Sequence, residues 1–242
     1  MSHPAILNDD QKLKSSRLWR KIKAVAPVRF ERYELADDED DLQRVARFGW
    51  NIALCEAVTP TMNAAEISLR NGIHRSLIDA THYEEWLFQE DRFRASEQSL
   101  LDKAIKNIGE RGADATCPNN LVAELPFRFW TGLLKAQYET FIWRRLSKFR
   151  GAKLPEIFPD GREKVYGTFN EARIIRNRAS HHEPLFDHPG LAQSVAQTRE
   201  AAAAISRIYT ASVLTIDRFP AIWNNGNGID RFRVIYFKEM GF

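Results

Sequence analysis

The chain has 242 residues, of which 35 are Lys or Arg and 32 are Asp or Glu, giving a formal net charge of +3. A hydrophobic fraction of 44% supports a folded core and excludes global disorder, while the small net charge excludes a histone-like cationic protein. The positive charge is mostly arginine, which suits bidentate contacts with carboxylates or phosphates.

The first 35 residues carry an excess of Lys and Arg. Leu13, Trp19, Ile22 and Val25 recur among them at helical spacing, which predicts a short amphipathic helix with a basic face, ending before Pro27. This segment is either a solvated helix at the edge of the domain or an arm that contacts phosphate groups.

An acidic run at residues 37–42 stands directly before an apolar stripe of helical spacing. We expect a helix to begin here, because carboxylates suit the positive end of the helix dipole. Pro60 is expected to end that helix, and Thr61 or Asn63 to cap a second one. The second helix has one apolar stripe, made of Ala65, Leu69, Ile73 and Leu77.

In the middle of the chain, residues 79–97 read as a loop with a short helical turn, and Leu100–Ile108 as a helix. The strongest predicted helix runs from Pro126 to Phe149, because apolar residues form a broad face there. Its aromatic side chains are expected in the core, with stacking on nucleic-acid bases as the alternative. These are Phe127, Trp130, Phe141 and Trp143.

A Gly- and Pro-rich loop is predicted at residues 149–161. The next helix starts at Gly161 and is expected to end near Glu183, because Pro184 disfavours helical geometry in the residue before it. A last long helix is predicted from Pro189–Gly190 to about Ile216.

The tail from Phe219 contains an Asn- and Gly-rich turn and a short β-like run, FRVIYF. The pattern as a whole predicts an all-α domain of about five or six main helices, since nothing suggests strand–helix alternation. Three parts are expected along the chain: a basic arm at 1–36, a helical domain at 37–218, and a tail at 219–242 packed on the same domain.

Neither a signal peptide nor an apolar run of roughly 18 residues is visible, so we expect a cytoplasmic protein without membrane contact. Cys55 and Cys117 form no C-x-x-C pair. His74 and His82 are eight residues apart without an acidic partner pattern and are expected to be surface or core residues. We therefore predict no metal and no cofactor.

The segment Arg173–Pro184, RIIRNRASHHEP, concentrates arginine and histidine at a helix end. Histidine can transfer protons at neutral pH, and the guanidinium group matches phosphate oxygens, so the pattern suits phosphodiester cleavage without a metal. On RNA the neighbouring 2′-hydroxyl could be the nucleophile. Asn177 could orient a catalytic side chain or hold a phosphate, and Arg173 and Arg178 could contact the RNA backbone.

Arg176 and His181 would lie about 140° apart around an ideal helix, so they do not share a face. Either the last turn unwinds, or two copies of the motif meet across a two-fold axis. The simpler alternative is that Arg176 pairs with an acidic neighbour and His181 caps its own helix. A further basic cluster at the end of the central helix either suits the helix dipole or binds phosphate. It contains Arg144, Arg145, Lys148 and Arg150.

RNRASHHEP resembles the motif of HEPN domains, and its fuller form is similar to the abortive-infection (Abi-like, AbiD/AbiF-type) branch of that superfamily. Four residues separate Arg176 from His181, within the four to six that the family allows. Asn63–Leu77 looks like the family's early helix, and Ala123–Trp143 looks like its central aromatic helix. The three blocks together span roughly residues 40 to 190.

The resemblance implies a helical bundle, often a homodimer, that acts as a metal-independent endoribonuclease in phage defence or as a toxin with an antitoxin partner. Arg176 and His181 would be the catalytic pair, with Asn177 and His182 as supporting residues. Glu66, Arg70 and Asn71 match the early helix, although Glu66 and Arg70 are also spaced to pair on a helix surface.

Two alternatives to cleavage are open. One is a non-catalytic RNA-binding module regulated by a small RNA or a protein partner. The other is a helical protein–protein adaptor, which the polar motif disfavours, because the centre of a helix interface is usually apolar.

Overall fold

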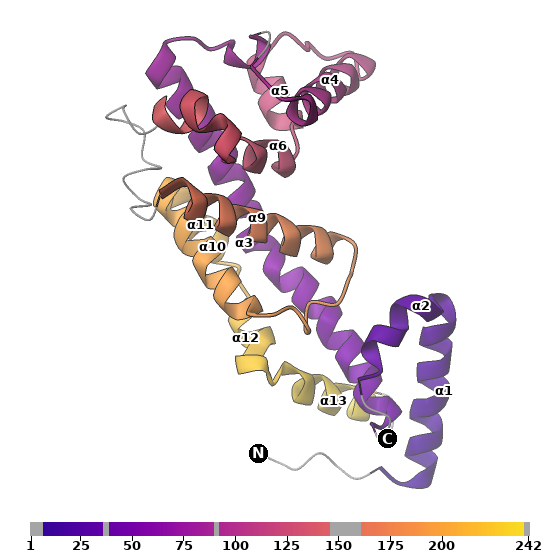
Figure 1. Cartoon of the computed structure of the whole chain (residues 1–242). Helices are drawn as coiled ribbons and strands as arrows, with labels where there is room; N and C mark the ends of the chain where they lie inside the picture. The colour runs from indigo at the N-terminus through magenta and orange to yellow at the C-terminus, as the bar shows by residue number, and fades with distance from the viewer. Residues whose placement is uncertain (1–6, 36–38, 90–91, 146–160, 240–242) are drawn as a thin grey trace. The chain divides into compact units, whose positions relative to one another are not determined.

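The computed structural model describes residues 7–35, 39–89, 92–145 and 161–239 (Figure 1). Helices are the only regular secondary structure in these ranges, which confirms the predicted all-α fold class. The chain forms two compact units. Unit 1 comprises the described residues of Met1–Thr59, Ile175–Ala192 and Ile216–Phe242, and unit 2 those of Pro60–Ile174 and Gln193–Thr215. The predicted three-part division stays a prediction.

Unit 1 begins with helix α1, Asp9–Val25, where the sequence predicted it. A capping box starts this helix: Gln11 N donates to Asn8 Oδ1, and Asn8 N donates to Gln11 Oε1, both at 2.9 Å. Asp9 and Asp10 occupy the first turn, where the dipole favours carboxylates. The helix ends at Val25, before Pro27 begins the short helix α2, Pro27–Phe30.

The core of unit 1 is aromatic. Trp19 of α1 packs edge-on against Phe30 of α2, with ring centroids 5.9 Å apart. Tyr33, in the 3₁₀ helix η1 (Glu31–Tyr33), is 1% exposed and lies 5.2 Å from the ring of Phe186. Burial raises the pKa of Tyr33 far above its usual value. Each buried aromatic side chain contributes about 1.5–3 kcal/mol, so these contacts hold the N-terminal helices onto Phe186.

Helix α3 runs from Asp41 to Thr81 without ending at Pro60, so the predicted break there is wrong. Thr61 and Asn63 consequently lie inside a helix and cap nothing. An interior proline removes one backbone hydrogen bond at a cost of about 3 kcal/mol. Buried apolar positions continue on both sides of it, and their packing outweighs that loss. The acidic run does precede the helix start, as predicted.

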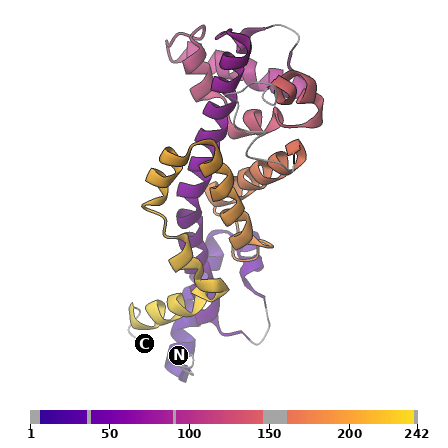
Figure 2. The same cartoon turned by 90° about the vertical axis from the view of Figure 1, so that its left-hand side faces the viewer.

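In unit 2 the helices α4 (Ala95–Glu110), α5 (Pro118–Glu124) and α6 (Phe127–Gly132) group around the C-terminal part of α3 (Figures 1 and 2). The 3₁₀ helix η2, Trp86–Phe88, is the short helical turn predicted in the preceding loop. Trp86 and Trp130 are at most 1% exposed and pack against each other in the core of this unit.

The long helix predicted from Pro126 to Phe149 is wrong. After α6 the backbone becomes extended at Lys135 and then forms a 3₁₀ helix, η3 (Ala136–Tyr138), and a π-helix, η4 (Glu139–Trp143). The break places the Tyr138 hydroxyl between two partners: it donates to Glu97 Oε2 and accepts from Arg94 N, both at 2.8 Å. Residues beyond 145, including the predicted loop at 149–161, lie outside the described residues.

Helix α9 covers Gly161–Ser180, so it begins where predicted and ends three residues before Glu183. Two further predictions near the C-terminus are corrected. The predicted last helix is divided at Ser206, with φ −143° and ψ 82°, into α10 (Leu191–Ile205) and α11 (Arg207–Leu214).

The predicted β-like run FRVIYF is helical and lies inside α13, Gly228–Glu239. This helix follows α12, Phe219–Trp223, and the 3₁₀ helix η5, Asn224–Gly226. A short apolar run is compatible with a strand or a buried helix, so contacts decide between them. Here the Tyr236 ring packs so close to Gly49 that a Cβ there would lie 2.5 Å from it.

Candidate functional site

The predicted catalytic pair lies in unit 1 at the C-terminal end of α9. Arg176 and His181 are both exposed, and Asn177 between them is half-buried. His181 N donates to Asn177 O at 3.1 Å, so the helical register persists as far as His181. The last turn therefore does not unwind between the two residues, and they stay about 140° apart around the helix axis.

His182 ends the helix with its backbone. Its φ of +51° is left-handed, His182 N donates to Ala179 O at 3.0 Å, and Glu183 N donates to Arg178 O at 2.8 Å. This is the Schellman arrangement, in which glycine usually holds the left-handed position. It explains why α9 ends earlier than Pro184 alone would require. His182 therefore contributes to the structure through its left-handed backbone, which ends α9.

We call the segment His181–Asp187 the motif turn. Its backbone is hydrogen-bonded to the buried side chain of Asn51 in α3. Asn51 is 1% exposed; its Oδ1 accepts from Leu185 N at 2.6 Å, and its Nδ2 donates to Glu183 O at 3.2 Å. Such a pair of bonds satisfies two backbone groups that would otherwise be buried without partners. Asn51 belongs to no predicted site, and its one sequence signal is a polar residue beside an apolar helical stripe.

Cys55, one helical turn after Asn51, also contacts the motif turn: its Sγ lies 3.8 Å from Glu183 O. Burial raises the pKa of the Cys55 thiol to about 11, against the lowering effect of Arg178 and Arg29. The thiol is therefore protonated at neutral pH and acts as a weak donor, not as a nucleophile.

Arg178, predicted to contact RNA, instead contacts two residues of the motif turn, Pro184 and Asp187. Its guanidinium pairs with Asp187 Oδ1 at 2.8 Å and donates to Pro184 O, and its side chain is 18% exposed. Arg32 of η1 reaches the other oxygen of Asp187, at 3.1 Å. A phosphate at Arg178 would have to compete with Asp187, so this arginine is better placed to fix the turn than to hold substrate.

Arg29 of α2 brings a basic side chain to the motif that the spacing analysis did not foresee. Its Nη2 donates to the carbonyl oxygen of His181, and the residue is exposed. A shallow groove of about 610 Å³ runs beside this contact, lined by Ala26, Pro27, Val28, Arg29, Arg32, Glu183 and Pro184. The N-terminal segment is thus in direct contact with the predicted catalytic turn.

The supporting residues predicted from the early-helix block belong to unit 2. Arg70 Nη1 donates to Ala123 O at 3.0 Å and to Val122 O at 3.4 Å, at the C-terminal end of α5. A cation there satisfies carbonyl groups that have no partner within the helix. Arg70 therefore has a structural task. Glu66 and Asn71 are half-buried on the same helix, α3.

The other predicted RNA contacts in unit 2 are also engaged locally. Arg173 donates from Nε and Nη2 to Asn170 Oδ1, at 3.2 and 3.0 Å. Arg145 lies over the ring of Phe141 at 4.7 Å and donates to its carbonyl at 2.9 Å. Arg144 is exposed, whereas Lys148 and Arg150 lie outside the described residues.

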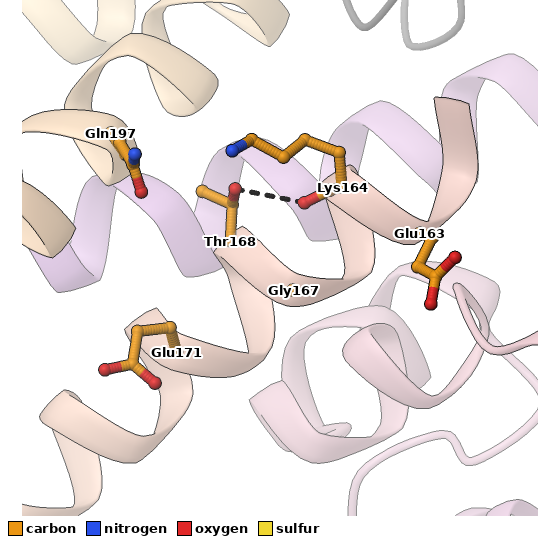
Figure 3. Close-up of a pocket in the computed structure, with 6 residues that line it drawn as sticks. All are labelled: Glu163, Lys164, Gly167, Thr168, Glu171 and Gln197. Carbon is orange, nitrogen blue, oxygen red and sulfur yellow. Dashed lines mark hydrogen bonds between the residues drawn. The ribbon is translucent and has the colours of Figure 1, made fainter. Parts of the chain in front are cut away.

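Figure 3 shows a second open groove, which lies in unit 2 between α9 and α10 and contains none of the predicted site residues. Glu163, Lys164 and Glu171 project from α9, and Gln197 comes from α10. Charges of both signs line it, and Thr168 Oγ1 donates back to Lys164 O at 3.1 Å. Nothing in this arrangement selects one ligand chemistry.

Across the described ranges, no group of three or more His, Cys, Asp or Glu side chains is arranged to hold a metal ion. Within the same ranges, no helix has the length and apolar character needed to cross a membrane.

Comparison with known proteins gives no match: neither a family model, nor a curated protein, nor a solved structure matches the chain. The resemblance to HEPN domains therefore rests on the three sequence blocks alone.

Proposed function

We propose that the protein is a metal-independent endoribonuclease of the HEPN, Abi-like type, acting in phage defence or as the toxin of a toxin–antitoxin pair. The observation that supports this most is the motif turn. Asn51, Arg178 and Arg29 each contact it, while His181 at its start and Arg176 on the preceding helical turn are exposed. A fixed backbone beside two exposed functional groups is what a site needs to keep catalytic geometry.

RNA cleavage of this kind needs only the substrate's own 2′-hydroxyl, a histidine and an arginine. The RNA 2′-oxygen attacks the adjacent phosphorus, the bond from phosphorus to the 5′-oxygen breaks, and a cyclic phosphate and a 5′-hydroxyl form. The 2′-hydroxyl loses a proton and the leaving 5′-oxygen gains one; His181 accepts the first proton and delivers one to the 5′-oxygen, and Arg176 stabilises the charge that develops on the phosphate oxygens. Arg29 would bind a neighbouring phosphate, since its guanidinium is at the same turn.

Because Arg176 and His181 point in different directions from one helix, we propose that the active assembly is a homodimer. Two motifs meeting across a two-fold axis would let each cleavage site take its arginine from one copy and its histidine from the other.

A non-catalytic RNA-binding module is the second candidate. Arg29 and Arg32 favour it, because they add positive charge to the motif turn without adding a group that transfers protons. This candidate predicts RNA binding that weakens with salt and yields no product on prolonged incubation.

The test is cleavage of a mixed RNA pool by the purified full chain in EDTA. We expect cleavage by the unchanged protein and a loss of about 10²–10⁴-fold in rate for His181→Ala, with a comparable loss for Arg176→Ala. His182→Asn is the matched control, because asparagine tolerates the left-handed conformation and leaves His181 in place. Full activity in both Ala variants would exclude this catalytic pair.

A further inference from the structure

A groove of about 730 Å³ in unit 2 separates one face of α3 from the junction of α10 and α11. Ser68, Asn71, Arg75 and Asp79 line it from α3 at spacings of three or four residues, so they share one face, and Ser76 lines it beside Arg75. A helix face turned towards a neighbouring helix is usually apolar. This one is mostly polar over three turns, which favours a polar ligand.

Gly72 lies within the same face and explains how the two sides come together. A Cβ on Gly72 would lie 2.7 Å from Cγ2 of Ile205, the last residue of α10. The two helices therefore approach closely at Gly72, and the polar side chains around Gly72 line the groove.

Several of these polar groups have no protein partner. Ser68 is 2% exposed, yet its hydroxyl forms no hydrogen bond among the described residues. Neither Arg75 nor Asp79 forms a hydrogen bond or ion pair within the part of the chain that the structure describes, and both are exposed. A buried hydroxyl without a partner costs about 1–3 kcal/mol, so a hydrogen bond from a bound ligand to Ser68 would be favourable.

The opposite wall of the groove favours an anion. Helix α11 begins at Arg207 after Ser206, whose side chain caps no backbone group, and Ser206 and Tyr209 both line the groove. The first N–H groups of a helix have no acceptor within it, and the helix dipole adds positive charge there. The Arg75 guanidinium adds positive charge from the α3 side of the same groove.

We propose that this groove binds a small sugar phosphate. Arg75 and the N-terminus of α11 hold the phosphate, while Asp79, Asn71 and Ser76 bond the sugar hydroxyls. Asp79 disfavours a ligand made of phosphates alone, because a carboxylate repels them and accepts from hydroxyl groups. The volume lies within the range of small-molecule sites, about 300–1,000 Å³. The proposal does not depend on RNA cleavage.

Calorimetric titration of the full chain with ribose 5-phosphate tests this site. We expect saturable binding that weakens at least about tenfold in Arg75→Gln, because a charge-assisted pair with phosphate is lost. Ser68→Ala should weaken binding by a smaller factor. The control is Arg128→Gln, which removes an exposed arginine of the same unit from α6, outside the groove, and should leave binding unchanged.

Ribose and inorganic phosphate serve as separate probes and should each bind more weakly than ribose 5-phosphate. Absence of saturable binding by the unchanged protein would overturn the proposal. So would equal losses in Arg75→Gln and Arg128→Gln. Inorganic phosphate binding as tightly as ribose 5-phosphate would overturn the assignment of a sugar to the site.

Discussion

At the scale of single residues, the contacts of the motif change what each of its members is suited to do. Arg178 pairs with Asp187, and His182 supplies a left-handed backbone, so both shape the turn. Arg176 and His181 are both exposed. Asn51, which belongs to no motif, supports the turn from the core of unit 1.

His182→Gly should stabilise unit 1. A non-glycine residue in the left-handed region costs about 1 kcal/mol relative to glycine, and the two turn-closing hydrogen bonds use only the backbone. We expect the denaturation midpoint to rise and RNA cleavage to persist. A lowered midpoint would show that the imidazole makes contacts that outweigh the backbone strain.

His74 should make unit 2 sensitive to acid. It is 7% exposed, and its Nδ1 accepts from Trp86 Nε1 at 3.0 Å. Burial, followed by the charge of Arg75, lowers the pKa of His74 in the folded state. The unfolded chain therefore binds the proton first, so stability is complete above the unfolded pKa of about 6.5 and declines as pH falls below it.

Thermal unfolding measured from about pH 7.5 down to about pH 5 checks this, with His74→Asn as the comparison. Asparagine keeps an acceptor for Trp86 and does not titrate, so the variant should lose less stability over this interval. An identical pH dependence in both proteins would rule His74 out as its source.

At the scale of elements, packing overrode local sequence signals in both directions. Pro60 does not end α3, while the apolar segment after Gly132 does not continue as one helix. A proline costs one hydrogen bond, and flanking burial offsets that cost. Of the aromatic side chains predicted as core, Phe127 and Trp130 are buried, whereas Phe141 and Trp143 are only half-buried. Tyr138 makes its hydrogen bonds with Arg94 and Glu97 through a backbone break that no periodicity encodes.

Gly49→Ala should loosen α13 from α3. The added Cβ would lie 2.5 Å from the Tyr236 ring, and such overpacking costs about 1–3 kcal/mol. Gly167→Ala is the control, because nothing lies within 4 Å of a Cβ at this helical position, and alanine there should stabilise by about 0.5–1 kcal/mol. Urea denaturation measures both effects. Additive losses in Gly49→Ala/Tyr236→Ala would contradict a direct clash.

At the scale of the whole molecule, the arrangement of charge matters more than its total. The net charge of +3 does not show that positive charge is concentrated at one place. Four arginines lie at or beside the motif turn: Arg29, Arg32, Arg176 and Arg178. Such a local cluster attracts phosphate even on a nearly neutral protein.

If each cleavage site combines two copies, a mixture of inactive variants should recover activity. Arg176→Ala and His181→Ala chains, co-expressed so that they form mixed dimers, would leave one intact Arg–His combination in each mixed dimer. With random pairing, about a quarter of the unmixed protein's activity should return. An RNA cleavage assay on the co-purified dimers measures it. Complete inactivity of the mixture would place both catalytic groups in one copy.

The sequence by itself determined the all-α class, the position of α1 and the start of α3, because these depend on apolar periodicity, charge at helix ends and capping residues that are neighbours along the chain. It also identified the Arg–His motif. The tertiary structure decided that His182 ends α9, that FRVIYF is helical, and that Asn51 and Arg29 reach the motif turn. These partners are more than a hundred residues apart along the chain, and only packing brings such residues together.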